Sequence, residues 1–118
     1  MSFSTVLSAS MYGMKVEFVH VEADVSNGLP GFQMVGYLSS EVKEAAERVR
    51  TAIRNSGLDF PAKKTVINLA PATMKKRGAA FDLPIAVGIL LSLGKLDSAK
   101  VRSMLIVGEL SLDGKVRK

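Results

Sequence analysis

Cysteine is absent from the 118-residue sequence, and histidine occurs once, as His20. Without cysteine, neither a disulfide framework nor thiolate chemistry can be proposed. A serine-histidine triad would have to use His20, and nothing else in the sequence points to that residue. Glu22 and Asp24 follow it at strand-like spacing but would be a poor ligand set for zinc. We therefore interpret His20 as a solvated histidine on the polar face of a strand.

Long hydrophobic runs and targeting segments are also missing. The longest apolar run, Leu83–Leu93, has about half the length needed to cross a bilayer. Residues 1–5 place no basic segment ahead of an apolar one, as a secretory signal would. Because the absence of cysteine also fits a reducing compartment, we expect a soluble, cytoplasmic protein.

What the chain does contain is enough apolar residues for one core. Its hydrophobic content of 47% over 118 residues is that of an ordinary globular domain. We expect residues 1–118 to form a single domain without a linker. Internal repeats and low-complexity segments are not found.

Positive charge is concentrated in the middle of the chain, within a net charge of +5. Residues 39–77 hold nine bases against four acids, whereas residues 1–38 hold one base against three acids. Such asymmetry permits contact with nucleic acid or an acidic partner. The alternative is a solvated, lysine-rich surface.

A buried strand followed by a buried helix forms the centre of the predicted fold. The strand contains the β-branched residues of 65–67, and Leu83–Leu93 is too apolar on every side for a surface helix. Asp82 stands just before this helix, where it is predicted to cap the first turn; a catalytic carboxylate would need a second acid nearby, and none is visible. Residues 88–95 resemble a phosphate-binding loop only superficially, with the wrong spacing, so no nucleotide site is predicted.

A basic loop, Lys75, Lys76 and Arg77, lies between that strand and that helix. The free N–H groups of the helix N-terminus and these three cations together predict an anion, phosphate or DNA contact. Lys63 and Lys64 form a second basic cluster ahead of the strand. The alternative is an ordinary exposed loop.

The first half of the chain reads mainly as a hairpin. Strands are predicted at Phe3–Ser10 and Met14–Val25, with a turn at Gly13 and a further short strand at Phe32–Gly36. The apolar pattern of the second strand changes face at Phe18-Val19, which predicts a β-bulge or a sharp coil of the strand at that point.

A surface helix is predicted to start at Ser39 and Ser40 and to end near Ser56. Glu44 and Arg48 are spaced to form an ion pair on it, and Gly57 suits its left-handed end. Its core face carries Val42, Ala45, Ala46, Val49 and Ile53.

The last part of the chain predicts a short helical turn within Leu96–Arg102, a strand at Met104–Val107 and a hairpin at Asp113-Gly114. Its return strand would have only residues 115–118, which suggests a fragment of a longer protein. Altogether we expect an α/β (α+β) fold, a mixed β-sheet with two main helices packed on one face.

Several motifs, in one order and spacing along nearly the whole chain, resemble the N-terminal domain of the ComM proteins, also called YifB or magnesium-chelatase-like ATPases. The motifs are Gly28–Phe32, Val42–Glu44, Glu47–Arg50, Asn55–Gly57, Phe60-Pro61, Val66–Ala72, Gly78, Phe81–Ala86 and Val107–Gly114. The resemblance implies a Lon-protease-like domain that precedes an AAA+ ATPase module, which is absent here. It further implies that the parent is a homo-hexamer that uses ATP and magnesium in its motor domain and drives DNA branch migration in natural transformation. This domain would then contact its own AAA+ module and neighbouring subunits.

The Lon likeness can be compared residue by residue. Lon peptidases carry a catalytic serine in a Gly-Pro-Ser-Ala-Gly loop, and aligning Gly78-Ala79-Ala80 with it places Ala80 at the nucleophile, where alanine has no oxygen to attack a carbonyl. The partner lysine would follow Gly108-Glu109 by more residues than the chain contains, and Lys115 and Lys118 come too early. The resemblance therefore implies a non-catalytic accessory domain with no cofactor or metal of its own. Alternatives are an active serine-lysine peptidase, a stand-alone nucleic-acid-binding module or part of a magnesium chelatase ATPase subunit.

Overall fold

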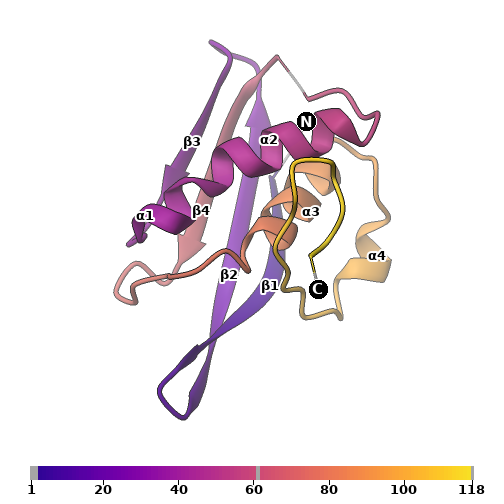
Figure 1. Cartoon of the computed structure of the whole chain (residues 1–118). Coiled ribbons are helices and arrows are strands. Elements are labelled where there is room, and N and C mark those ends of the chain that lie inside the picture. Colours follow the sequence, from indigo (N-terminus) through magenta and orange to yellow (C-terminus); the bar gives the residue numbers. More distant parts are fainter. Residues whose placement is uncertain (1–2, 61, 118) are drawn as a thin grey trace.

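The fold is built on a four-stranded sheet with the strand order β1-β2-β4-β3 (Figure 1). The computed structural model describes residues 3–60 and 62–117. Strand β2 is antiparallel to both β1 and β4, and β3 is parallel to β4, so the predicted mixed sheet is confirmed. The strands are β1 (Phe3–Tyr12), β2 (Lys15–Ser26), β3 (Gly31–Val35) and β4 (Lys64–Ala70).

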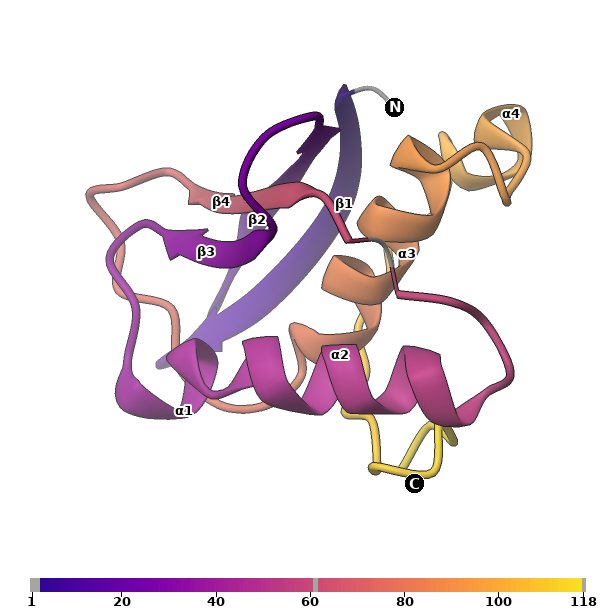
Figure 2. The ribbon, with the colours of Figure 1, turned by 90° about the horizontal axis from the view of Figure 1, so that it is seen from above.

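The two longer helices lie on the same side of this sheet, as predicted (Figure 2). Helix α3 packs on β1 and β2, and α2 packs on α3 and β3. The helices are α1 (Ser40–Lys43), α2 (Ala45–Asn55), α3 (Asp82–Ser92) and α4 (Ser98–Val101). None of the described helices is long and apolar enough to cross a membrane.

The core lies between the helices and one face of the sheet. Along β2, Val19, Val21, Ala23 and Val25 face the helices and are almost fully buried. Alternate residues such as His20 face the other, uncovered side, because side chains of a strand alternate between the two faces.

The predicted β-bulge at Phe18-Val19 is wrong. Strands β1 and β2 pair without interruption from Phe3↔Asp24 to Tyr12↔Lys15. Phe18 lies on the uncovered face and is 57% exposed. The apolar pattern changes because the end of the hairpin projects past the helices (Figure 1), so the core face of β2 ends there although the strand continues.

Helix α3 confirms the predicted buried helix, and small residues bring it close to the sheet. A Cβ placed on Gly88 would lie 3.1 Å from the Cβ of Ala23. The Ser4 hydroxyl donates to the Gly88 carbonyl at 2.7 Å and lies 2.9 Å from the Ser92 hydroxyl oxygen. The Ser92 hydroxyl donates to the Ala23 carbonyl at 3.2 Å, so these polar groups are satisfied within the helix-sheet contact.

The predicted surface helix is present but interrupted, since α1 ends at Lys43 and α2 begins at Ala45. Near this interruption, the Glu41 carbonyl accepts a hydrogen bond from Arg48 Nη2 at 2.9 Å. At its other end, Ser56 is the C-cap and Gly57 has a φ of 86°, which confirms the predicted helix end.

The C-terminal part differs from the prediction in one element. Helix α4 follows its N-cap Asp97, whose carboxylate accepts a hydrogen bond from Ala99 N at 3.0 Å. The short helical turn predicted within Leu96–Arg102 is therefore confirmed. The Asp113-Gly114 turn is confirmed, with Arg117 N donating to the Glu109 carbonyl at 2.8 Å; Lys118 lies outside the described residues.

Residues 104–107 do not form the predicted strand. They make one parallel bridge to the edge of β1, in which Ile106 N donates to the Leu7 carbonyl at 2.9 Å. The apolar composition of this segment reflects its packing beside the sheet, because Ile106 packs against the core.

Candidate functional site

The loop of residues 71–81 joins β4 to α3 and is held by backbone pairing to an earlier segment. Lys76 N donates to the Tyr37 carbonyl at 2.9 Å, and Ser39 N donates to the Lys76 carbonyl at the same distance. The Tyr12 hydroxyl donates to the Lys75 carbonyl from the β1–β2 hairpin. Two distant parts of the chain thus fix the position of the basic residues.

Lys76 was predicted as a possible anion or DNA contact, but the structure places its side chain in the interior. Its side chain is fully buried, and its Nζ donates to the Pro71 carbonyl. Burial lowers the pKa of the Lys76 ammonium, because a charged group loses hydration there. Its charge is therefore not available at the surface.

Lys75 and Arg77 are the cations of this loop that stay at the surface. Lys75 is half-buried, with Nζ 5.7 Å from the centre of the Tyr37 ring, and Arg77 is exposed. Lys64 begins β4, whereas the loop follows its end at Ala70, about 20 Å away at the rise of a strand. The structure therefore does not bring the two predicted basic clusters together.

Ala80 is exposed beside an apolar groove of about 380 Å³. Its carbonyl accepts a hydrogen bond from Gly108 N at 2.8 Å, which fixes the end of the loop. Besides Ala80, the groove is lined by Ala9, Ser10, Met11, Val16, Leu105 and Val107. Among these described lining residues, Ser10 alone carries a hydroxyl.

Asp82 does not cap helix α3 as predicted. It is the first residue of the helix, after Phe81 at the N-cap, and its buried carboxylate makes contacts distant in sequence. Arg48 Nε donates to Oδ2 at 2.8 Å and Nη2 to Oδ1 at 3.0 Å, while Leu110 N donates to Oδ2 at 3.1 Å. Arg48 therefore pairs with Asp82 rather than with Glu44, and this bond raises the pKa of the guanidinium.

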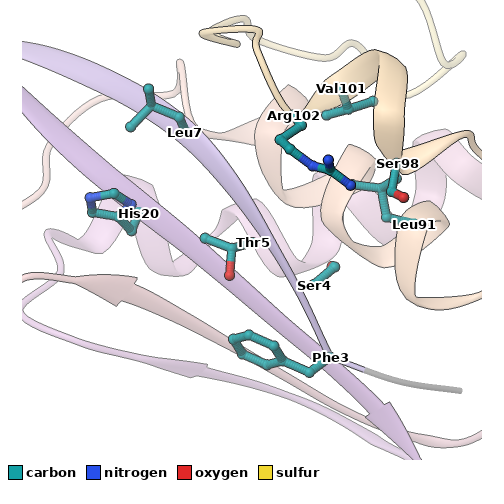
Figure 3. A pocket seen from close by; sticks show the side chains of 9 residues that line it. All are labelled: Phe3, Ser4, Thr5, Leu7, His20, Leu91, Ser98, Val101 and Arg102. Carbon is teal, nitrogen blue, oxygen red and sulfur yellow. The ribbon is translucent and has the colours of Figure 1, made fainter.

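A cleft of about 550 Å³ lies between β1 and α4 (Figure 3). His20 and Arg102 belong to opposite walls, one on β2 and the other just after α4. The lining residues are Phe3, Ser4, Thr5, Leu7, His20, Leu91, Ser98, Val101 and Arg102. In the described residues no group of three His, Asp or Glu side chains could hold a metal ion.

Comparison with known proteins identifies the family. The family model described as subunit ChlI of Mg-chelatase matches residues 21–118. The chain is 46% identical to the uncharacterized protein YifB of Salmonella typhimurium and 44% identical to the competence protein ComM of Haemophilus influenzae, each over 99% of this chain and 23% of the relative. The chain belongs to the ComM/YifB family of magnesium chelatase-like proteins. The predicted resemblance is thereby confirmed, and the chain spans about a quarter of the length of these curated relatives.

Two of the motifs that this ComM/YifB chain shares with the family contain residues that make packing contacts within the fold. The acid of Phe81–Ala86 is the partner of Arg48, and Gly108 of the Val107–Gly114 motif lies where a Cβ would meet Leu83 at 3.1 Å. Sequence reasoning missed the Asp82 contact, although an acid at the edge of an apolar run is a signal that it needs a buried partner.

Proposed function

We propose that the chain is a non-catalytic accessory domain of a ComM-type AAA+ ATPase whose full-length parent acts on DNA. The parent would use ATP and magnesium in a separate motor domain, and would drive branch migration as a homo-hexamer. Two findings support this proposal. One relative is named competence protein ComM, and the chain covers 23% of that relative, so a motor domain could lie in the remainder of the relative's length.

The observation that carries the non-catalytic role is the chemistry of the loop before α3. Ala80, which the resemblance to Lon peptidases aligns with their nucleophile, offers an exposed methyl group. The fully buried Lys76 directs its amine at the Pro71 carbonyl. A serine-lysine peptidase needs a hydroxyl activated by a neighbouring amine. The loop is therefore better suited to holding α3 in place than to cleaving a peptide.

The surface left uncovered by the helices supports a role in assembly. Met11, Val16 and Phe18 lie on the projecting end of the β1–β2 hairpin and are each more than half exposed. Exposed apolar side chains grouped in this way are typical of protein contacts. In the parent, this hairpin end would pack against the motor or a neighbouring subunit.

The peptidase alternative is tested by incubating the chain with unfolded casein and with a fluorophosphonate that acylates active serines. We expect neither casein fragments nor a covalent adduct in the intact mass, while an active Lon peptidase treated in parallel shows both. A stoichiometric adduct on the chain, or casein cleavage that the reagent inhibits, would overturn the non-catalytic assignment.

A further inference from the structure

A second cleft, of about 230 Å³, opens at the end of the molecule where β3 and β4 begin. The two strands start side by side, because Gly31 pairs with Lys64 in their parallel register. The lining residues are Pro30, Gly31, Arg50, Phe60 and Lys63. Since the Ala80 loop follows the other end of β4, this cleft is separate from the loop discussed above.

Two lining residues of the cleft, Phe60 and Arg50, belong to a group that also includes the Phe32 ring. The rings of Phe32 and Phe60 are stacked, with centroids 5.7 Å apart and planes 13° from parallel. Arg50 Cζ lies 5.7 Å from the centroid of each ring. Both phenylalanines are partly buried against the core, so the aromatic surface of Phe60 is held in place at the edge of the cleft.

Within the part of the chain that the structure describes, no buried acid neutralises the two cations of the cleft. Arg50 Nη1 lies 3.3 Å from Glu47 Oε1, and the Glu47 side chain is 75% exposed, so this ion pair is weak. This ion pair uses only one guanidinium nitrogen, and Arg50 donates no other hydrogen bond to the described residues, so most of its five N–H donors remain available. Lys63 Nζ donates to the neutral Asn27 Oδ1 at 3.2 Å, which leaves its charge uncompensated.

We propose that this cleft binds single-stranded nucleic acid, with a base against Phe60 and an adjacent phosphate between Arg50 and Lys63. Stacking on an aromatic ring needs an unpaired base, while the cations neutralise the backbone. A base paired within a duplex would not reach the ring. This inference goes beyond the proposed function, which assigns the action on DNA to the parent, and it does not depend on the chemistry at Ala80.

Fluorescence anisotropy with a labelled oligothymidylate of about 15 nucleotides tests the proposal. The Arg50→Gln and Lys63→Gln variants should each raise Kd by about 3–10-fold, and binding should weaken steeply between about 50 mM and about 200 mM salt. Phe60→Leu, which keeps an apolar side chain but removes the ring, should raise Kd by about 5–10-fold, since stacking contributes about 1–3 kcal/mol per base. Phe60→Tyr should bind like the unaltered chain.

Lys43→Gln and Lys100→Gln are matched controls, because they remove the same charge from exposed positions on α1 and α4. They should change Kd by less than about twofold. Equal losses in the control and cleft variants would show diffuse charge attraction and overturn the site. So would unchanged binding by Phe60→Leu, equal competition by a duplex of the same length, or no binding at low salt.

A loss of fold in Phe60→Leu is detected by thermal unfolding, and Arg50→Lys then decides the question. It keeps the charge but removes the planar group that lies over the rings, so it should still weaken binding; wild-type affinity in this variant would overturn the proposal. These readouts are independent of the casein and fluorophosphonate assays, so failure of this site is distinguishable from failure of the proposed function.

Discussion

Arg48 Nε donates to Asp82 Oδ2 at 2.8 Å and thereby joins α2 to the first residue of α3. The carboxylate is fully buried, and the arginine side chain is 22% exposed. Because Leu110 N donates to the same oxygen, one carboxylate connects both helices to the C-terminal segment. This contact explains why an acid stands at the edge of the most apolar run of the chain.

Removing the arginine should destabilise the fold strongly. In Arg48→Met the Asp82 carboxylate stays buried without its partner, and we expect a loss of about 3–5 kcal/mol in the free energy of unfolding. Urea unfolding followed by circular dichroism measures this loss. Glu47→Gln, which breaks the exposed pair with Arg50, is the control and should cost less than about 1 kcal/mol. A similar, small effect of both substitutions would contradict the structural role assigned to Asp82.

The close approach of α3 to the sheet predicts the effect of a larger residue at Gly88. A side chain there would press on Ala23, whose Cβ lies 3.1 Å from the position of an added Cβ. We expect Gly88→Val to lower the free energy of unfolding by about 1–3 kcal/mol through overpacking. Ala99→Val, at an exposed site of α4, is the control for the β-branched residue. If both variants unfold at the same urea concentration, the predicted clash is absent.

The buried Lys76 predicts a specific dependence of stability on pH. Burial lowers the pKa of the Lys76 ammonium in the folded chain, so the unfolded chain binds this proton more tightly. The free energy of unfolding therefore rises as the pH passes from the folded pKa up to the unfolded pKa of about 10.4. Lys76→Met removes this rise. The urea midpoint of the unaltered chain should therefore rise relative to that of the Lys76→Met variant as the pH is raised from 7 toward about 10.

This comparison also removes the contribution of Tyr12, since both proteins contain it. Burial raises the pKa of the Tyr12 phenol, so the stability it contributes is lost as pH rises above about 10. A midpoint difference that is constant across the alkaline range would mean that the Lys76 amine is hydrated like a surface lysine.

Introducing a hydroxyl at residue 80 should not create a peptidase. In Ala80→Ser the new oxygen would lack an activating amine, because the Lys76 amine bonds to the Pro71 carbonyl. We expect casein hydrolysis and fluorophosphonate labelling to remain at the level of the unaltered chain. Measurable casein turnover by this variant would contradict this expectation, because it would show that an activating group lies within reach of residue 80.

Local features of the sequence predicted many elements of the fold. The all-round apolar composition of Leu83–Leu93 predicted α3, and Gly57 and Asp113-Gly114 predicted a helix end and a turn, because these depend on backbone preferences of neighbouring residues. The candidate site was predicted less well. Asp82 and Arg48 are separated by 34 residues, so no local pattern connects them.

The sequence by itself determined most of the elements, the mixed sheet, the family and the absence of a nucleophilic oxygen at Ala80, since these follow from residue identity and spacing. It did not determine the C-terminal segment, where the strand predicted at Met104–Val107 does not form. Only the tertiary structure decided which of three consecutive cations is buried. Lys76 points inward, while Arg77 remains exposed, because the loop backbone pairs with Tyr37 and Ser39 from a distant part of the chain. Burial of a charge depends on what packs around it, and that environment is assembled by long-range contacts.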